Sequence, residues 1–321
     1  MFVVATGTYL PPSRPNTDHA GAAGSPDNEW PTRCVAGPED HPASMSALAL
    51  RAALASARID AGELALVAYT GRARDYLPSW SVATEVMKLV GAPPSCVGLD
   101  LSLGCAALPA ALELARGWLE VPRRRYAAVI DAERSTGAID RVDPESARLW
   151  GHGDGAAALI ASDEPSRSGA SLEYVGAAFA SHATYNDLLM PPHGGTRSPR
   201  AERGEQQLVL RLDATPAADV FGIHSRLYER AWEELRARTG VSAIDHVICS
   251  QLSPAWVERT VARFHRPRPK SVVNTGRIAG HVGGADLILG LDAVLRSGPG
   301  TCSVLAAGTA PFATALALFR A

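Results

Sequence analysis

The stretch VGLDLSLGCAA, residues 97–107, predicts a strand that turns directly into a helix. It opens with a mostly apolar run of strand length, and an alanine- and leucine-rich pattern with helical spacing continues to residue 119. We therefore expect Cys105 at the N-terminus of that helix. Unpaired backbone N–H groups and the positive end of the helix dipole favour a thiolate at such a position, and they can also hold an oxyanion.

The stretch KSVVNTGRIAGHVGGAD, residues 270–286, repeats this arrangement in the second half of the chain. A strand pattern leads through a glycine-rich turn into another helical pattern, and each unit is followed by a further strand pattern (127–131 and 302–306). His281 lies in the turn, and Asp286 follows five residues later. At this spacing the carboxylate can fold back and fix the tautomer of the imidazole. The repeat predicts a duplicated fold whose halves supply a thiol and its base.

Each of these three residues also has an interpretation without catalysis. A free cysteine such as Cys105 is most often a small buried hydrophobe, although Gly104 and Ala106 leave room for a substrate beside it. Asp286 could simply complement the helix dipole, with His281 as a loop residue. Position and spacing leave both interpretations open.

The composition indicates a well-cored globular chain of one or two domains. Its 321 residues are 46% hydrophobic, and the formal net charge of -2 gives no electrostatic argument for a nucleic-acid or membrane partner. No stretch approaches ~18 uninterrupted apolar residues, and the start of the chain lacks the pattern of a signal peptide. The five cysteines show no CxxC spacing, and their odd number argues against a complete disulfide framework. We therefore expect a cytoplasmic protein without a bound metal ion.

Strand and helix patterns alternate along most of the chain, which predicts an α/β fold with largely parallel or mixed sheets. A segment at 163–169, rich in Ser, Pro and Glu, marks the junction between two halves. We expect an N-terminal half at 1–165 that carries the nucleophilic cysteine. A C-terminal half at 166–321 would carry the histidine and the aspartate.

Short motifs spread over nearly the whole chain are typical of one protein family. They are GTYLP at 7–11, DNEW at 27–30, Thr32-Arg33, Asp100 with GCA at 104–106, and GDGAA at 153–157. With these motifs the chain resembles the thiolase superfamily, and within it the ketoacyl-acyl carrier protein (ACP) synthase III group. The resemblance implies a five-layer α-β-α-β-α thiolase fold of duplicated halves, a homodimer, and Cys105 as the acyl-accepting nucleophile at the end of a narrow tunnel. It also implies that no cofactor is bound permanently and that the acyl donor is carried on coenzyme A or on the phosphopantetheine of an ACP. His152, just before the last motif, is expected to be structural.

Two positions depart from the condensing enzymes of this group. Those enzymes carry a histidine in a His-Gln-Ala-Asn stretch, where this chain has SQLS at 250–253. Their Gly-Asn-Thr-Ser motif, whose asparagine pairs with that histidine, corresponds here to GHVG at 280–283. The pair stabilises the carbanion equivalent that forms when malonyl-ACP loses carbon dioxide, and both of its members are replaced. Ser250 offers one weak hydrogen-bond donor in that place.

The stretch HVGGAD at 281–286 instead resembles an acyltransferase branch of the group, found in antibiotic and polyketide pathways. Members of that branch use a Cys or Ser, a His and an Asp to move an acyl group from a thioester to an alcohol or amine. The resemblance implies that His281 deprotonates Cys105 and later the incoming hydroxyl, while Asp286 holds the ring. The backbone N–H groups of Cys105 and of Gly308 would bind the oxyanion.

Further candidates for substrate binding are Trp30, Arg33, Arg148, His182, His193 and Ser250. Trp30 and Arg33 match the region where relatives contact the coenzyme A end of a donor, although a core tryptophan is an equal alternative for Trp30. Arg148 matches a phosphate contact, one residue out of register. His182 and His193 fall in the stretch that lines the tunnel in relatives and could orient the acceptor, but a lone loop histidine is more often a surface residue.

Three functions remain open on this basis. The favoured one is an acyltransferase of secondary metabolism that moves an acyl group from acyl-ACP or acyl-CoA to a small hydroxylated acceptor, or to an amine, without decarboxylative condensation. The second is a ketosynthase III-type starter condensation or a carrier-protein priming enzyme. The third is a catalytically silent, thioester-binding partner subunit, and the retained Cys105 with a newly placed His281 and Asp286 argues against it.

A carrier-protein donor would need a basic docking surface. Scattered arginines of the C-terminal half could form one, although an ordinary solvated surface is the simpler interpretation. These arginines are Arg226, Arg230, Arg259, Arg263, Arg266 and Arg268.

Overall fold

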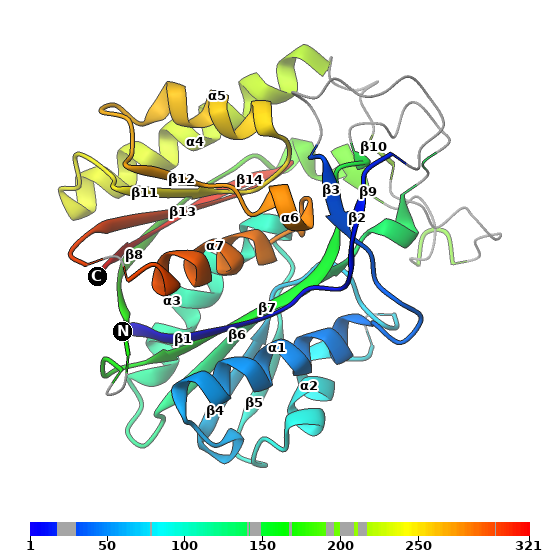
Figure 1. The fold of residues 1–321 in the computed structure, drawn as a ribbon, viewed down its shortest axis with the longest axis vertical. Helices are drawn as coiled ribbons and strands as arrows, with labels where there is room; N and C mark the ends of the chain where they lie inside the picture. Colours follow the sequence, from blue (N-terminus) through cyan, green and yellow to red (C-terminus); the bar gives the residue numbers. More distant parts are fainter. Residues whose placement is uncertain are drawn as a thin grey trace.

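The protein is built from five layers, α-β-α-β-α, in the computed structural model (Figure 1). The structure describes residues 1–17, 30–77, 79–139, 141, 149–166, 169–190, 196–199, 209–210, 217–298 and 300–321. Its α-helices are α1 (Pro42–Ala57), α2 (Val82–Val90), α3 (Ala107–Leu119), α4 (Ala217–Thr239), α5 (Pro254–Phe264), α6 (Gly276–Ala279) and α7 (Ala285–Arg296). Helices α1 and α2 cover one outer face, α4 and α5 cover the other, and α3 and α7 lie in the middle layer (Figure 1).

The two β layers are the two halves of one ten-stranded mixed sheet. The first half contains, in spatial order, β1 (Phe2–Tyr9), β7 (Asp154–Ser162), β6 (Tyr126–Arg134), β4 (Leu64–Tyr69) and β5 (Val97–Asp100). The second half contains β8 (Leu172–Ser181), β14 (Ala313–Arg320), β13 (Ser303–Ala310), β11 (His246–Cys249) and β12 (Ser271–Val273). Two small sheets pair β2 (Ser13–Pro15) with β3 (Thr32–Cys34) and β9 (Leu189–Met190) with β10 (Val209–Leu210).

The two halves of the large sheet have the same design. In each half the first three strands pair antiparallel and the last two join in parallel, and the strands and helices follow one another along the chain in the same order. The halves meet through a short antiparallel pairing in which Phe2 and Val3 of β1 lie opposite Glu173 and Leu172 of β8. The predicted duplicated, five-layer α/β fold is therefore confirmed. The exact division at residues 165 and 166, between β7 and β8, stays a prediction.

Hydrogen bonds fix the segment that leads to Cys105. Asp100, the last residue of β5, accepts hydrogen bonds from the backbone N–H groups of Val82 (3.0 Å) and Ala83 (2.9 Å) at the start of α2. The Ser81 hydroxyl accepts a further bond from the backbone of the same helical turn and acts as its N-cap. The end of β5 is thus tied to a neighbouring helix before the chain turns toward the cysteine.

The two helices of the middle layer both begin in the buried interior. The first two turns of α7 are buried, and the helix is packed between strands of both sheet halves. Its first turn includes the buried Asp286, and α3 begins directly after the turn that holds Cys105. Both predicted strand-turn-helix units are confirmed. Every helix within the described ranges is too short or too polar to span a bilayer.

Candidate active site

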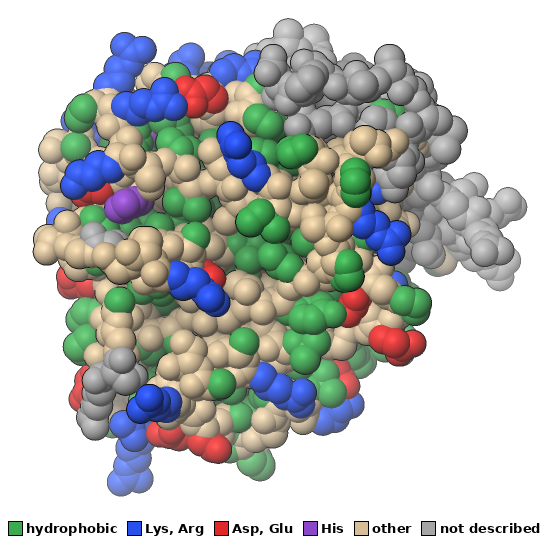
Figure 2. Space-filling view, in the orientation of Figure 1, with side chains coloured by type: hydrophobic (Ala, Val, Ile, Leu, Met, Phe, Trp, Pro, Cys, Tyr) green, Lys and Arg blue, Asp and Glu red, His purple; other side chains and the backbone are tan. Residues whose placement is uncertain are grey.

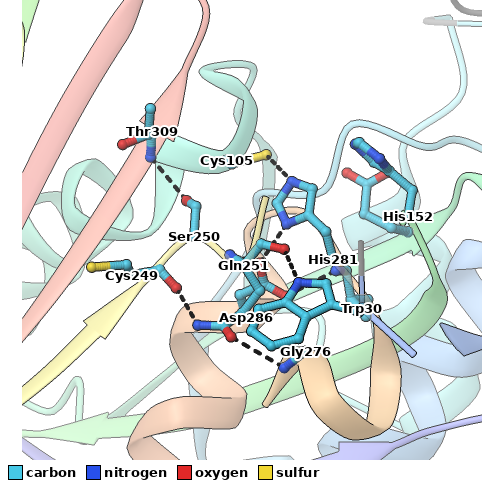
Figure 3. A network of polar contacts seen from close by, with 12 residues as sticks. Trp30, Cys105, His152, Cys249, Ser250, Gln251, Gly276, His281, Asp286 and Thr309 are labelled. Carbon is cyan, nitrogen blue, oxygen red and sulfur yellow. Dashed lines mark hydrogen bonds and ion pairs between the residues drawn. The ribbon is translucent and has the colours of Figure 1, made fainter. Parts of the chain in front are cut away.

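Cys105 lies in the short 3-10 turn η2 (Gly104–Ala106) between β5 and α3. Gly104 has a φ of 55° in this turn, a left-handed conformation that glycine adopts without strain. Cys105 is partly exposed, and its Sγ lies 3.6 Å from Nε2 of His281 (Figure 3). The turn therefore presents the thiol directly to the imidazole.

His281 is held by its backbone in the loop between α6 and α7. Its N–H donates to the carbonyl of Gly151 (2.9 Å), and its own carbonyl accepts from the N–H of Gly153 (3.0 Å). Gly280, just before it, has a φ of 72°, and a Cβ atom there would lie 2.6 Å from the carbonyl oxygen of Gly151. The loop can run this close to its neighbour only with glycine at that position. The imidazole is 1% exposed, so its position is set by the fold rather than by solvent.

Asp286 fixes the orientation of the His281 ring. Its Oδ2 lies 2.5 Å from Nδ1 of His281 and also accepts a hydrogen bond from the backbone N–H of Gln251 (2.7 Å). Its Oδ1 accepts from the backbone N–H of Val282 (2.8 Å). Because the carboxylate is fully buried and accepts at both oxygens, Nδ1 carries the hydrogen and Nε2 faces the thiol. The sequence spacing predicted this contact, and the structure brings all three residues together.

The charges of the site favour a protonated histidine. Burial lowers the pKa of His281, but the Asp286 carboxylate and Cys105 outweigh burial and raise the pKa to about 10. A positively charged imidazole beside a cysteine stabilises the thiolate, which is the nucleophilic form of the side chain. The site therefore places a positively charged imidazole, backed by a carboxylate, against Sγ of Cys105.

Gln251 is a part of the site that the sequence analysis did not single out. Its side-chain amide donates to the carbonyls of Cys249 (2.8 Å) and Val273 (3.1 Å), so that the residue bridges β11 and β12. This bridge holds the Gln251 backbone N–H against Asp286. The position within SQLS at 250–253 was the one sequence signal that could have pointed to it.

Trp30 packs behind this network and does not reach the thiol. Its indole is 3% exposed, its Nε1–H donates to the carbonyl of Gln251 (2.6 Å), and a Cβ atom on Gly276 would collide with its ring. These contacts give Trp30 a place in the core. A contact with the acyl donor stays a prediction.

Ser250 directly follows β11, and Gly308 lies on the neighbouring strand β13. The buried Ser250 hydroxyl accepts a hydrogen bond from the backbone N–H of Thr309 (3.0 Å), which ties β13 to β11 (Figure 3). Gly308 is so close to the η2 turn that a Cβ atom there would lie 2.4 Å from the carbonyl oxygen of Cys105. This closeness to the nucleophile is compatible with a Gly308 backbone N–H that binds the oxyanion. That role stays a prediction.

Of the other candidates, Arg33 and His182 lie within the described residues. Arg33 is buried, and its Nη1 donates to Oδ1 of Asn16 (2.6 Å). His182 is exposed, with its ring centre 4.7 Å from that of Tyr185. Arg148 and His193 lie outside the described residues. Among the residues that the structure does describe, no three His, Cys, Asp or Glu side chains come together as a metal site would require.

Comparisons with known proteins point to one family. The sequence profile of 3-oxoacyl-[acyl-carrier-protein (ACP)] synthase III matches residues 99–176, which contain Cys105. Beta-ketoacyl-[acyl-carrier-protein] synthase III of Neisseria meningitidis is 26% identical over 305 residues, which cover 92% of this chain and 90% of that protein. Acetoacetyl CoA synthase NphT7 of a Streptomyces species is 26% identical over 330 residues, which cover 99% of this chain and 98% of that protein.

Solved structures agree on the fold. Xanthomonas campestris OleA with bound lauric acid and lauroyl-CoA matches with a TM-score of 0.83 at 17% identity, over 100% of this chain and 99% of that chain. The thiolase fold is therefore confirmed. Taken together, the chain is similar to ketoacyl-ACP synthase III and related synthases over nearly its whole length, and it shares the fold of OleA.

Proposed function

We propose that the protein is an acyltransferase that moves an acyl group from acyl-ACP or acyl-CoA, through Cys105, to a hydroxyl or amine of a small molecule. No decarboxylative condensation is part of this reaction. The observation that carries the proposal is the contact of His281 with both Cys105 (3.6 Å) and Asp286 (2.5 Å). A fixed base beside the nucleophile serves transfer to an acceptor that must lose a proton.

The first half-reaction acylates Cys105. The thiolate attacks the thioester carbonyl carbon, and the backbone N–H groups of Cys105 and Gly308 stabilise the negative oxygen of the tetrahedral intermediate. The bond from the carbonyl carbon to the donor sulfur then breaks. The departing thiolate takes the proton from Nε2 of His281, which leaves a neutral imidazole beside a thioester.

The second half-reaction uses that neutral imidazole as a base. Nε2 of His281 takes the proton of the acceptor hydroxyl while its oxygen attacks the thioester carbonyl carbon. When the tetrahedral intermediate collapses, the bond to Sγ breaks and Cys105 leaves as a thiolate. The imidazolium and the thiolate are then restored, and Asp286 has held the ring throughout.

The surroundings of Ser250 support transfer over condensation. Decarboxylation of a malonyl group needs donors that stabilise the carbanion equivalent in the site. Ser250, which replaces the histidine of the condensing enzymes, is 1% exposed; its hydroxyl oxygen accepts from the backbone N–H of Thr309, and it offers a single neutral O–H donor in place of an imidazole. The synthases among the relatives favour a second candidate, starter condensation or carrier-protein priming.

The surface beside α4 and α5 supports a carrier protein as donor. The arginines named from the sequence are exposed on these helices and on the segment after α5, and Figure 2 shows Lys and Arg side chains along that edge of the molecule. Some are already engaged, such as Arg268 with Glu258 (2.8 Å). A homodimer, a cytoplasmic location and a role in polyketide or antibiotic biosynthesis belong to the same proposal.

Product analysis tests the proposal. The acylated enzyme is freed of excess donor and offered either malonyl-ACP or a panel of hydroxylated small molecules, with Cys105→Ala as the control for uncatalysed transfer. We expect an ester of a hydroxylated acceptor and no β-keto product. Release of carbon dioxide together with a β-ketoacyl-ACP would contradict the proposal and support condensation.

A further inference from the structure

A second histidine is fixed next to the catalytic base. His152 and His281 are opposite each other in an isolated parallel β-bridge, with their ring centres 4.6 Å apart and the ring planes at 73°. Residues that pair directly across two strands project their side chains on the same side. Figure 3 shows the ring of His281 between Cys105 and His152.

Glycines on both strands enforce this pairing. A Cβ atom on Gly153 would lie 1.9 Å from the carbonyl oxygen of Ala279, and one on Gly280 would lie 2.6 Å from the carbonyl oxygen of Gly151. Such distances are far below a van der Waals contact, so larger residues would push the two strands apart. The sequence Gly151-His152-Gly153 is therefore built to bring one imidazole against another.

The hydrogen bond of His152 fixes its tautomer. Nδ1 lies 2.8 Å from the carbonyl oxygen of Leu149, and because a carbonyl only accepts, Nδ1 carries the hydrogen. Burial and the charges of His281 and Arg72 lower the pKa of His152 well below 6.5, so the ring is neutral. Within the described part of the chain the imidazole makes this one hydrogen bond. Its Nε2 is thus an acceptor with a lone pair, on a side chain that keeps 7% exposure.

The place of the acceptor follows from the proposed function, on which this inference rests. The reacting hydroxyl must reach Nε2 of His281, the atom that faces Cys105. A second hydroxyl on the adjacent carbon lies about 3 Å from the first, close to one hydrogen-bond length. The imidazole of His152, whose ring centre is 4.6 Å from that of His281, lies at a comparable distance from the base.

We propose that Nε2 of His152 binds a second hydroxyl of the acceptor, and that the acceptor is therefore a vicinal diol, as in a sugar or another polyol. One hydroxyl gives its proton to His281 and is acylated. Its neighbour donates a hydrogen bond to His152 and sets the orientation. His152 is thus a specificity-determining residue of the second half-reaction and has no part in the first.

The test separates the two half-reactions. Acyl-Cys105 enzyme is mixed with propane-1,2-diol or, at the same concentration, with propan-1-ol, and the loss of the acyl adduct is followed by intact-protein mass spectrometry. We expect the diol to discharge the wild-type adduct about tenfold faster, the effect of one additional hydrogen bond. In His152→Phe the acylation rate is expected to stay within about twofold, while the preference for the diol falls to about one.

Two further variants keep the test decisive if His152→Phe folds poorly. His152→Gln retains an acceptor oxygen and is expected to keep part of the preference. His246→Phe, a change at a histidine bonded to Ser271 on the outer strands, is the matched control and is expected to keep all of it. If His152 had only a structural role, its replacement would slow acylation and would slow transfer to both alcohols by the same factor.

The outcomes distinguish the two proposals. If no adduct forms in the wild type, or if neither alcohol discharges it, the proposed function is wrong and the inference falls with it. If the adduct forms and is discharged, but without a preference for the diol in the wild type, the inference alone is overturned. An unchanged preference in His152→Phe overturns it equally.

Discussion

The two strand-turn-helix units occupy equivalent places in the two halves, yet their functional residues differ in solvent exposure. Cys105 lies partly exposed in a short turn between β5 and α3. His281, in the loop before α7, and Asp286, in the first turn of α7, are 1% and 0% exposed and are held by backbone hydrogen bonds. One topology therefore presents a nucleophile in one half and locks a base in the other.

This difference follows from what each group must do. The nucleophile must meet a large thioester, so its turn needs open space and free N–H groups. The base must take and return a proton twice in each cycle, so its ring has to stay in one tautomer and one orientation. Burial supplies that constraint, because each polar atom of Asp286 finds its partner within the protein.

The largest expected effect comes from removing the base. His281→Ala takes away the group that both stabilises the thiolate and accepts the proton of the acceptor, so we expect transfer to fall by about 10³-fold or more. Single-turnover rates of acylation and of transfer would measure it. His246→Ala is the matched control and should change neither rate by more than about twofold. Equal rates for His281→Ala and the wild type would show that His281 is not the base.

Asp286→Asn should cost somewhat less activity and also some stability. The amide cannot accept from both backbone N–H groups and from Nδ1 at once. The tautomer of the His281 ring is then no longer fixed, and we expect the transfer rate to fall by about 10²- to 10³-fold. One buried donor left unpaired lowers the free energy of unfolding by about 1–3 kcal/mol. Asp292→Asn, on the same helix, is the control, because Asp292 instead binds Thr6 and Arg296. A wild-type transfer rate in Asp286→Asn would remove the aspartate from the account.

Gly308→Ala tests the turn that holds Cys105. The new Cβ atom would collide with the carbonyl of Cys105 at 2.4 Å, so the η2 turn must shift. Misplacing the nucleophile in this way should slow acylation by about 10- to 100-fold. Gly117→Ala, on α3, is the matched control, since a Cβ atom there meets nothing within 4 Å. If both variants are acylated at the wild-type rate, the space around Cys105 is not constrained as described.

The most gradual effect is a pH dependence of stability. Folding raises the pKa of His281 from about 6.5 to about 10, so its contribution to stability is complete below pH 6.5 and is lost as the pH rises toward 10. The free energy of unfolding should therefore decrease more steeply between pH 6.5 and 10 in the wild type than in His281→Asn, by at most about 1.4 kcal/mol per pH unit. Denaturant titrations at several pH values measure the difference. Parallel curves for the two proteins would contradict a raised pKa.

The sequence predicted the two local units, and their repetition predicted that Cys105 meets His281, but other contacts across the fold were missed. The strand, the glycine turn and the helix at Cys105 were predictable, because they lie within about twenty residues and follow from periodicity and turn chemistry. The contact of His281 with Asp286 was predictable for the same reason, as the two are five residues apart. Gln251 and His152 were not, because their contacts with Asp286 and His281 span 35 and 129 residues and depend on how β11 and the loop before β7 are placed. His152, expected to be structural, became a site candidate only through its bridge to His281.

The central claim is that Cys105 carries the acyl group. Intact-protein mass spectrometry after incubation with a panel of acyl-CoA and acyl-ACP thioesters tests it most directly, in the wild type, in Cys105→Ala and in Cys302→Ala as a buried-cysteine control. We predict a mass increase of one acyl group in the wild type and in Cys302→Ala, lost on addition of a hydroxylated acceptor, and no increase in Cys105→Ala. Normal labelling of Cys105→Ala would contradict the account.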